Sequence, residues 1–133
     1  MAVLLLQIGS RLSILGRQFL SQAKNRTQKM NEVEFNDNVD ELFTVIEDAI
    51  DDLDADVDCE ISGGVLTLQC PDGSVLIFSR QTATKELWLA ARSGGFHYTW
   101  QNNEWYCGRT EQTLKTMLET ISRDQIGEVL VID

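Results

Sequence analysis

The stretch from Glu47 to Glu60 reads EDAIDDLDADVDCE, and the hydrophobic period of the chain changes within it. Before this stretch, apolar residues recur every three or four positions, as on one face of a helix. Toward its end they alternate with carboxylates, as in a half-buried strand. Eight of its residues are acidic and none is basic. The stretch therefore marks a helix-to-strand junction and concentrates negative charge there.

Charge is divided unevenly along the chain. Five of the eleven basic residues precede Met30, where there is no acid, whereas residues 31–133 carry six basic and twenty-one acidic residues, a net charge of −15. The 133 residues are enough for one domain with a buried core. Because so acidic a domain repels nucleic-acid phosphate and anionic membranes, we expect its partners to be cations and basic protein surfaces.

Residues 1–29 are expected to lie outside the fold. They combine apolar residues at helical spacing with Arg and Ser, which is typical of a mitochondrial presequence. Their apolar run is too short to cross a bilayer, which takes about 20 residues. The alternative is an upstream extension of the reading frame, with initiation at Met30. Both alternatives stay open, and residues 30–133 are predicted to form the domain.

The apolar pattern of this domain predicts a helix, an antiparallel sheet and a second helix. The first helix begins near Phe35 and carries an apolar stripe as far as Leu53. Thr110 is predicted to cap the second helix. Five or six strands with short turns lie between the helices, at residues 57–61, 65–70, 74–80, 86–91, 96–100 and 104–107. This order predicts an α+β fold, an α-β-α two-layer sandwich with both helices packed on one face of the sheet.

Cysteine and histidine spacing does not indicate a closed metal site or a catalytic site. Cys59, Cys70 and Cys107 form no Cys-x-x-Cys pair, and His97 is the only histidine. We expect buried, reduced thiols, which suits a reducing compartment. His97 is expected to be an ordinary sheet histidine rather than a general base. No catalytic residue is predicted.

The carboxylates of the opening stretch form what we call the acidic ridge: Glu47, Asp48, Asp51, Asp52, Asp54, Asp56, Asp58 and Glu60. An EF-hand loop that began at Asp52 would need Gly and Glu where Val57 and Gly63 stand, so that motif is excluded. Hard oxygen ligands favour iron, Mn²⁺, Ca²⁺ or Mg²⁺. Alternate strand residues lie about 6.6–6.8 Å apart, which allows only shallow, weak sites. A solvated acidic face and a surface for a basic partner are the alternatives.

Trp100 is the best candidate for an exposed aromatic residue on the uncovered face of the sheet. It stands just before the polar turn at residues 101–103. An exposed aromatic there would bind a partner.

Several motifs follow one another along the chain from about Met30 onward. They are Asp58-Cys59-Glu60-Ile61-Ser62-Gly63-Gly64-Val65-Leu66-Thr67, Ser79-Arg80-Gln81, Leu87-Trp88-Leu89-Ala90, Gly94-Gly95-Phe96-His97-Tyr98, Glu104-Trp105 and Arg109-Thr110. In their order and spacing these motifs resemble the frataxin family, and most closely its bacterial CyaY type.

This resemblance implies a frataxin-like sandwich and a role in iron–sulfur cluster assembly. It implies that the acidic ridge binds iron (Fe²⁺/Fe³⁺) weakly at the surface and docks on a basic patch of the cysteine desulfurase. It further implies that Gln81, Trp88 and Trp100 meet the assembly of desulfurase and iron–sulfur scaffold protein. The expected protein is a non-enzymatic monomer, either an iron donor or a regulator, with iron-induced oligomers as the alternative oligomeric state. Ferroxidase activity and a metal-independent electrostatic adaptor are the alternative functions.

The expected location follows from the same resemblance. A bacterial-type protein would be cytoplasmic, whereas a presequence at residues 1–29 would direct it to the mitochondrial matrix.

Overall fold

A computed structural model of the chain describes residues 30–132, so the predictions for residues 1–29 lie outside the described part. Two helices flank a run of strands, which confirms the predicted α+β order. The elements are α1 (Glu32–Asp51), β2 (Asp58–Ser62), β3 (Val65–Gln69), β4 (Val75–Gln81), β5 (Glu86–Ala91), β6 (Gly94–Gln101), β7 (Glu104–Cys107), β8 (Gln112–Thr113) and α2 (Leu114–Gln125). None of the helices in residues 30–132 is long and apolar enough to cross a membrane.

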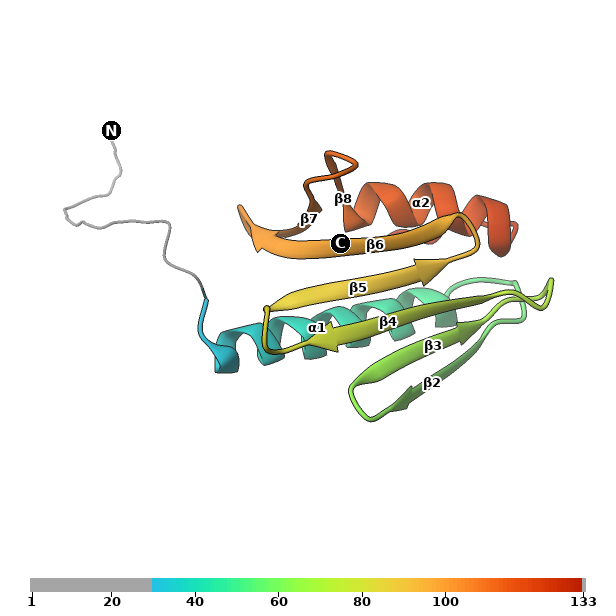
Figure 1. Ribbon diagram of the computed structural model, residues 1–133. Helices are drawn as coiled ribbons and strands as arrows, with labels where there is room; N and C mark the ends of the chain where they lie inside the picture. Colours follow the sequence, from blue (N-terminus) through green and yellow to red (C-terminus); the bar gives the residue numbers. More distant parts are fainter. Residues whose placement is uncertain (1–29, 133) are drawn as a thin grey trace, which may run out of the picture. The chain divides into compact units, whose positions relative to one another are not determined.

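The strands form one antiparallel sheet in chain order, from β2 at one edge to β8 at the other (Figure 1). Every neighbouring pair is joined by a short connection, so the sheet is a simple meander. It has seven strands, whereas five or six were predicted. The additional strand, β8, has two residues, and two residues are too few to show a period of two.

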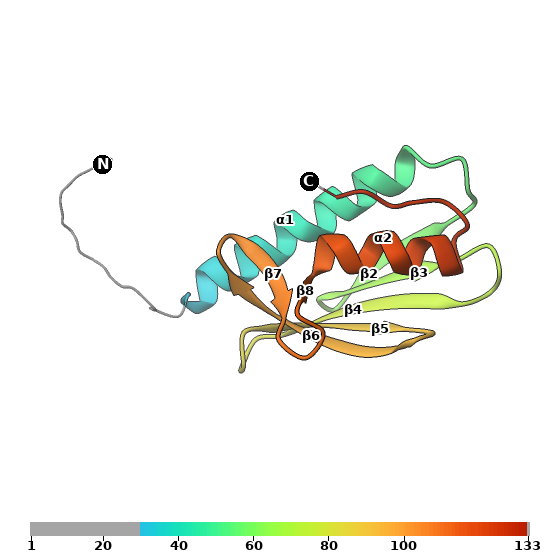
Figure 2. The ribbon, with the colours of Figure 1, turned by 90° about the horizontal axis from the view of Figure 1, so that it is seen from above.

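Both helices cover the same face of the sheet, as predicted (Figure 2). The apolar stripe of α1 is buried against this face at Phe35, Val39, Leu42, Phe43, Ile46 and Ile50. Inward-facing strand residues alternate with exposed ones, because successive side chains of a strand point to opposite faces. Leu66, Leu68, Leu76, Phe78 and Leu87 are fully buried between the two layers. Within residues 30–132, no helix covers the opposite face of the sheet.

The junction between α1 and β2 is longer than predicted. The helix begins at Glu32 and ends at Asp51, and the N–H of Leu53 bonds to the carbonyl of Ile50 (3.1 Å) in a tightened last turn. Strand β2 begins only at Asp58. Ile61 lies opposite the buried Leu66 and so shares the helix-covered face, but its side chain is 45% exposed because β2 is the edge strand.

The second helix begins later than predicted. Glu111 has a positive φ of 56°, which a right-handed helix does not allow, so Thr110 cannot be its cap. Thr113 takes that role, since its hydroxyl accepts a hydrogen bond from the N–H of Thr116 (3.3 Å).

The three cysteines are free thiols, as predicted. Cys70 and Cys107 are buried, whereas Cys59 on the edge strand is only half-buried. Burial raises the pKa of the Cys70 thiol, which keeps it protonated in the core.

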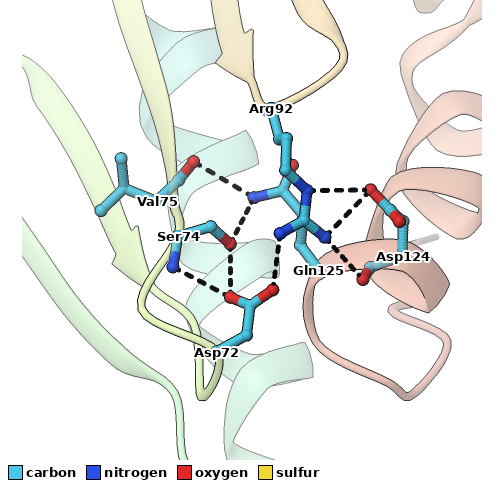
Figure 3. Close-up of polar contacts among 6 residues, drawn as sticks. All are labelled: Asp72, Ser74, Val75, Arg92, Asp124 and Gln125. Atoms are coloured by element: carbon cyan, nitrogen blue, oxygen red, sulfur yellow. Dashed lines mark hydrogen bonds and ion pairs between the residues drawn. The ribbon is translucent and has the colours of Figure 1, made fainter.

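A polar cluster fastens the two turns at the end of the sheet to the end of α2 (Figure 3). We call it the Arg92 clasp, and it comprises Asp72, Ser74, Arg92, Asp124 and Gln125. Arg92 donates to Asp72 Oδ2 (2.8 Å) and to the carbonyl of Asp124 (2.9 Å), and it pairs with the Asp124 carboxylate (3.2 Å). Two hydrogen bonds from Ser74, together with Arg92, lower the pKa of Asp72 to about 2.

Gln125 forms the buried centre of this clasp. Its side chain is 2% exposed. Its amide nitrogen donates to Ser74 Oγ (2.9 Å) and to the carbonyl of Val75 (3.3 Å), and its oxygen accepts from the N–H of Arg92 (2.9 Å). One side chain of α2 thus satisfies polar groups from two other segments of the chain.

Candidate functional site

The acidic ridge lies along one continuous path of helix, loop and strand. Glu47, Asp48 and Asp51 come from the last turns of α1, Asp58 and Glu60 come from β2, and the other three residues occupy the loop between them. All eight side chains are exposed. The fold therefore presents the predicted residues on a connected surface.

The helix part and the strand part of the ridge meet at Cys59. Burial raises the pKa of the Cys59 thiol, and the negative charges of Glu47 and Asp51 raise it further. The charges of these two α1 carboxylates therefore reach β2. The ridge is therefore one field of charge with contributions from two elements.

The ridge carries little compensating positive charge. Within residues 30–132, none of its eight carboxylates forms an ion pair with a basic side chain. The loop is held instead by its backbone, since the N–H of Asp54 donates to Glu128 Oε1 (3.3 Å). The described part of the chain contains no group of three or more His, Cys, Asp or Glu side chains arranged to hold a metal ion. The geometry thus offers separate, open carboxylates rather than a closed chelating site.

The uncovered face of the sheet carries an aromatic pair. Trp88 on β5 is 39% exposed and stacks on His97 of β6, with ring centroids 4.3 Å apart and an interplanar angle of 7°. Glu86 lies two residues before Trp88, and its Oε1 accepts a hydrogen bond from Trp88 Nε1 (2.9 Å). Gln81 pairs with Glu86 across β4 and β5, so it lies on this face as well. Gln81 and Trp88 are therefore neighbours on the open face.

Trp100 does not lie on that face, and the prediction of its place is wrong. It follows Phe96 and Tyr98 at alternate positions of β6, and both of these are buried on the helix-covered side. Trp100 is half-buried and packs edge-on against Trp105, with centroids 5.1 Å apart. The polar turn after Trp100 suggested exposure, but strand alternation from Phe96 would have placed it correctly.

Glu86 and His97 were not predicted as members of the open face. The signal was present for Glu86, because residues two apart in a strand share a face. The stack of His97 on Trp88 depends on the pairing register of β5 with β6, which places these two residues opposite each other. Register cannot be read reliably from one sequence. Beside this pair is a shallow hollow of about 530 Å³, which His97, Thr99 and Arg109 help to line.

Comparison with known proteins gives consistent matches over the described domain. Residues 28–128 match the model of the Frataxin-like domain family. The iron-sulfur cluster assembly protein CyaY of Pseudomonas entomophila (strain L48) is 45% identical over 106 residues, which cover 78% of this chain and 96% of that protein.

Solved structures also match. Frataxin from Psychromonas ingrahamii superimposes with a TM-score of 0.72 at 33% identity, covering 77% of this chain and 97% of the other. Trimeric frataxin from the yeast Saccharomyces cerevisiae, in a ferrous complex, gives a TM-score of 0.60 at 26% identity, with coverage of 77% and 92%.

Proposed function

This chain belongs to the frataxin family, and we propose on that premise that it is an iron-binding protein of iron–sulfur cluster assembly. It acts by binding, as an iron donor or as a regulator of the cysteine desulfurase and its scaffold complex. The observation that carries the proposal is the acidic ridge, whose eight exposed carboxylates have no basic partner in the described residues. Like charges held this close destabilise a domain, so their retention favours a binding role.

Iron is the cargo that this surface suits. Carboxylate oxygens are hard ligands and bind Fe²⁺ and Fe³⁺, and separate carboxylates hold ions weakly while water fills the remaining positions. A weakly held ion can be passed on, which fits a donor. The related yeast frataxin, whose structure was solved as a ferrous complex, supports iron as the cargo.

The same ridge suits a basic patch on the desulfurase. Opposite charges accelerate and orient the encounter of two proteins, and the effect weakens with salt. The proposed contact with the assembled desulfurase and scaffold uses Gln81 and Trp88, which are neighbours on the uncovered face of the sheet. The family resemblance implied that Trp100 also takes part in this contact. Because Trp100 lies on the helix-covered side of the sheet, the proposed contact does not include it.

Location follows from the relatives. The bacterial relative favours a cytoplasmic protein, and the mitochondrial matrix is the alternative if residues 1–29 are a presequence. N-terminal sequencing of the protein from its native host distinguishes these, because a start at Met30 indicates the cytoplasmic form.

Neutralising the ridge tests the proposed function. The variant carries Asp51→Asn, Asp52→Asn, Asp54→Asn and Asp56→Asn, and its affinities for Fe²⁺ and for the cysteine desulfurase are titrated separately. We expect both affinities to fall at least tenfold. Loss of desulfurase binding with intact iron binding would favour the metal-independent adaptor. Unchanged values for both would refute a binding role for the ridge.

A control variant with the same change in charge separates the ridge from net charge alone. Glu32→Gln, Asp37→Asn, Glu111→Gln and Glu119→Gln also remove four negative charges, at positions outside the ridge. We expect this variant to keep most of both affinities. Oxygen consumption during repeated turnover of Fe²⁺ tests the ferroxidase alternative in the same samples.

A further inference from the structure

A groove on the helix-covered side of the sheet plays no part in the function proposed so far. It has a volume of about 560 Å³ and lies between α1 and the elements from β6 to α2. Its apolar walls include Leu42, Val45, Trp100 and Trp105, and its charged side chains are Glu41, Glu104 and Lys115. This size and this mixture of aromatic surface with a few polar groups are typical of a binding site.

The aromatic wall of the groove is held in place by packing. Trp105 is buried and lies edge-on to Phe35 (6.0 Å between centroids) as well as to Trp100 (5.1 Å). Trp100 is only half-buried. Neither indole N–H has a hydrogen-bond partner among the described residues. Rigid, partly exposed Trp side chains lose little entropy on binding and often contribute most of the energy of an interface.

The groove continues into the acidic ridge along α1. Glu41 and Val45 line the groove, while Asp48 and Asp52 belong to the ridge. These positions follow at intervals of four, three and four residues, so Glu41, Val45 and Asp48 lie on one stripe of the helix, and Asp52 continues it just past the helix end. A partner segment that lies along this stripe meets carboxylates at one end and aromatic surface at the other.

We propose that the groove is the apolar anchor point for a basic, amphipathic segment of the partner that binds the acidic ridge. Cationic side chains of that segment lie along Asp48 and Asp52, and one apolar or aromatic side chain enters the groove beside Trp100. Glu41 and Glu104 outnumber Lys115, the basic residue that lines the groove, and they accommodate a flanking cation, which the indole face of Trp100 also attracts. The inference rests on the proposed function, because it assumes that the ridge binds a basic protein.

The two parts of such an interface have different kinetic signatures. Charges at the ridge steer the encounter, so their removal lowers the association rate and its dependence on salt. A buried anchor acts after the encounter, so its removal raises the dissociation rate and leaves the salt dependence unchanged.

The test measures binding of the full chain to the cysteine desulfurase at several salt concentrations by surface plasmon resonance. Trp100→Ala and Val45→Ser remove two half-buried walls of the groove, and a thermal melt confirms that each variant is folded. Val33→Ser is the matched control, because Val33 is an exposed valine in the first turn of α1, outside the groove, the acidic ridge and the uncovered face of the sheet. We expect Trp100→Ala to raise Kd about tenfold or more and Val45→Ser about threefold, through faster dissociation. The control should bind as the unchanged protein does.

The ridge variant with four Asp→Asn changes distinguishes a failure of the groove inference from a failure of the proposed function. If it loses binding while both groove variants bind normally, the groove inference is wrong and the proposed function stands. If the ridge variant binds the desulfurase normally, the ridge is not the docking surface, and that part of the proposed function fails. If the unchanged protein does not bind the desulfurase, the groove inference and the desulfurase contact are both overturned, while iron binding is decided by the separate titration.

Discussion

The acidic ridge and the Arg92 clasp are both rich in carboxylates, but the fold treats them in opposite ways. In the clasp, Asp72 and Asp124 share the guanidinium of Arg92, and Asp72 also accepts two hydrogen bonds from Ser74. In the ridge, no carboxylate of the described residues has a basic partner. Carboxylates that hold the fold together are paired with Arg, whereas those of the ridge are left available to something outside the chain.

This difference predicts opposite effects of mutation in the two regions. Changes to the clasp should lower stability and leave binding intact, because its groups are satisfied within the fold. Changes to the ridge should raise stability and weaken binding, since they relieve repulsion and remove ligands.

The largest expected effect is on the buried centre of the clasp. Gln125→Ala removes the partner of the part-buried N–H of Arg92 and of the part-buried carbonyl of Val75, which should lower the free energy of unfolding by about 1–2 kcal/mol. Urea unfolding measures the change, and Gln112→Ala at an exposed position is the control. If Gln125→Ala lowers the free energy of unfolding no more than the control does, water replaces the hydrogen bonds of the Gln125 amide.

A smaller loss is expected from Arg92→Met. This change removes the ion pairs to Asp72 and Asp124 but keeps the aliphatic part of the side chain. The melting temperature should fall by less than in Gln125→Ala, and the pKa of Asp72 should rise because Arg92 no longer stabilises its charge. Arg123→Met, also on α2, is the control. Equal melting temperatures for the two Arg variants would contradict a structural role for the clasp.

Neutralising the ridge should stabilise the fold slightly. Each relieved like-charge contact is worth a few tenths of a kcal/mol, so the variant with Asp51, Asp52, Asp54 and Asp56 changed to Asn should melt above the unchanged protein. Mg²⁺ or added salt should raise the melting temperature of the unchanged protein more than that of the variant. Identical responses to salt would show that the ridge carries no net repulsion.

The smallest expected effect is a change in how stability depends on pH between pH 5 and pH 2. The folded pKa of Asp72 is about 2, below its ordinary value of 3.8. A depressed pKa stabilises the fold above the ordinary value, and that contribution is lost as pH falls from about 4 to about 2. Urea midpoints between pH 5 and pH 2 should therefore fall less in Asp72→Asn than in the unchanged protein. If the urea midpoints of the two proteins fall equally between pH 5 and pH 2, the ionised Asp72 does not stabilise the fold.

The sequence was sufficient to predict a helix or a strand wherever its hydrophobic period continued for several turns or several residues. The stripe from Phe35 to Ile50 and the alternation at Leu66 and Leu68 led directly to α1 and β3. Boundaries failed where one local conformation decided them, as with the positive φ of Glu111 that delays α2. Strand β8 was too short to leave a pattern.

The candidate site was predictable to a similar degree. Exposure of the ridge follows from charge alone, because carboxylates without partners stay in water. The contacts of Trp88 with His97 and of Trp100 with Trp105 depend on strand register, which brings together residues distant in sequence. The groove depends on packing between α1, the sheet and α2, and no local pattern encodes it.

In the sheet that residues 30–132 form, strand β2 is an edge with one side unpaired, and such an edge is a template for another strand. Its exposed Ile61 would favour that pairing, whereas Asp58 and Glu60 oppose it. A second copy that approached along β2 would place its own carboxylates against these. The charges that attract cations therefore also keep molecules of this protein from joining edge to edge and aggregating.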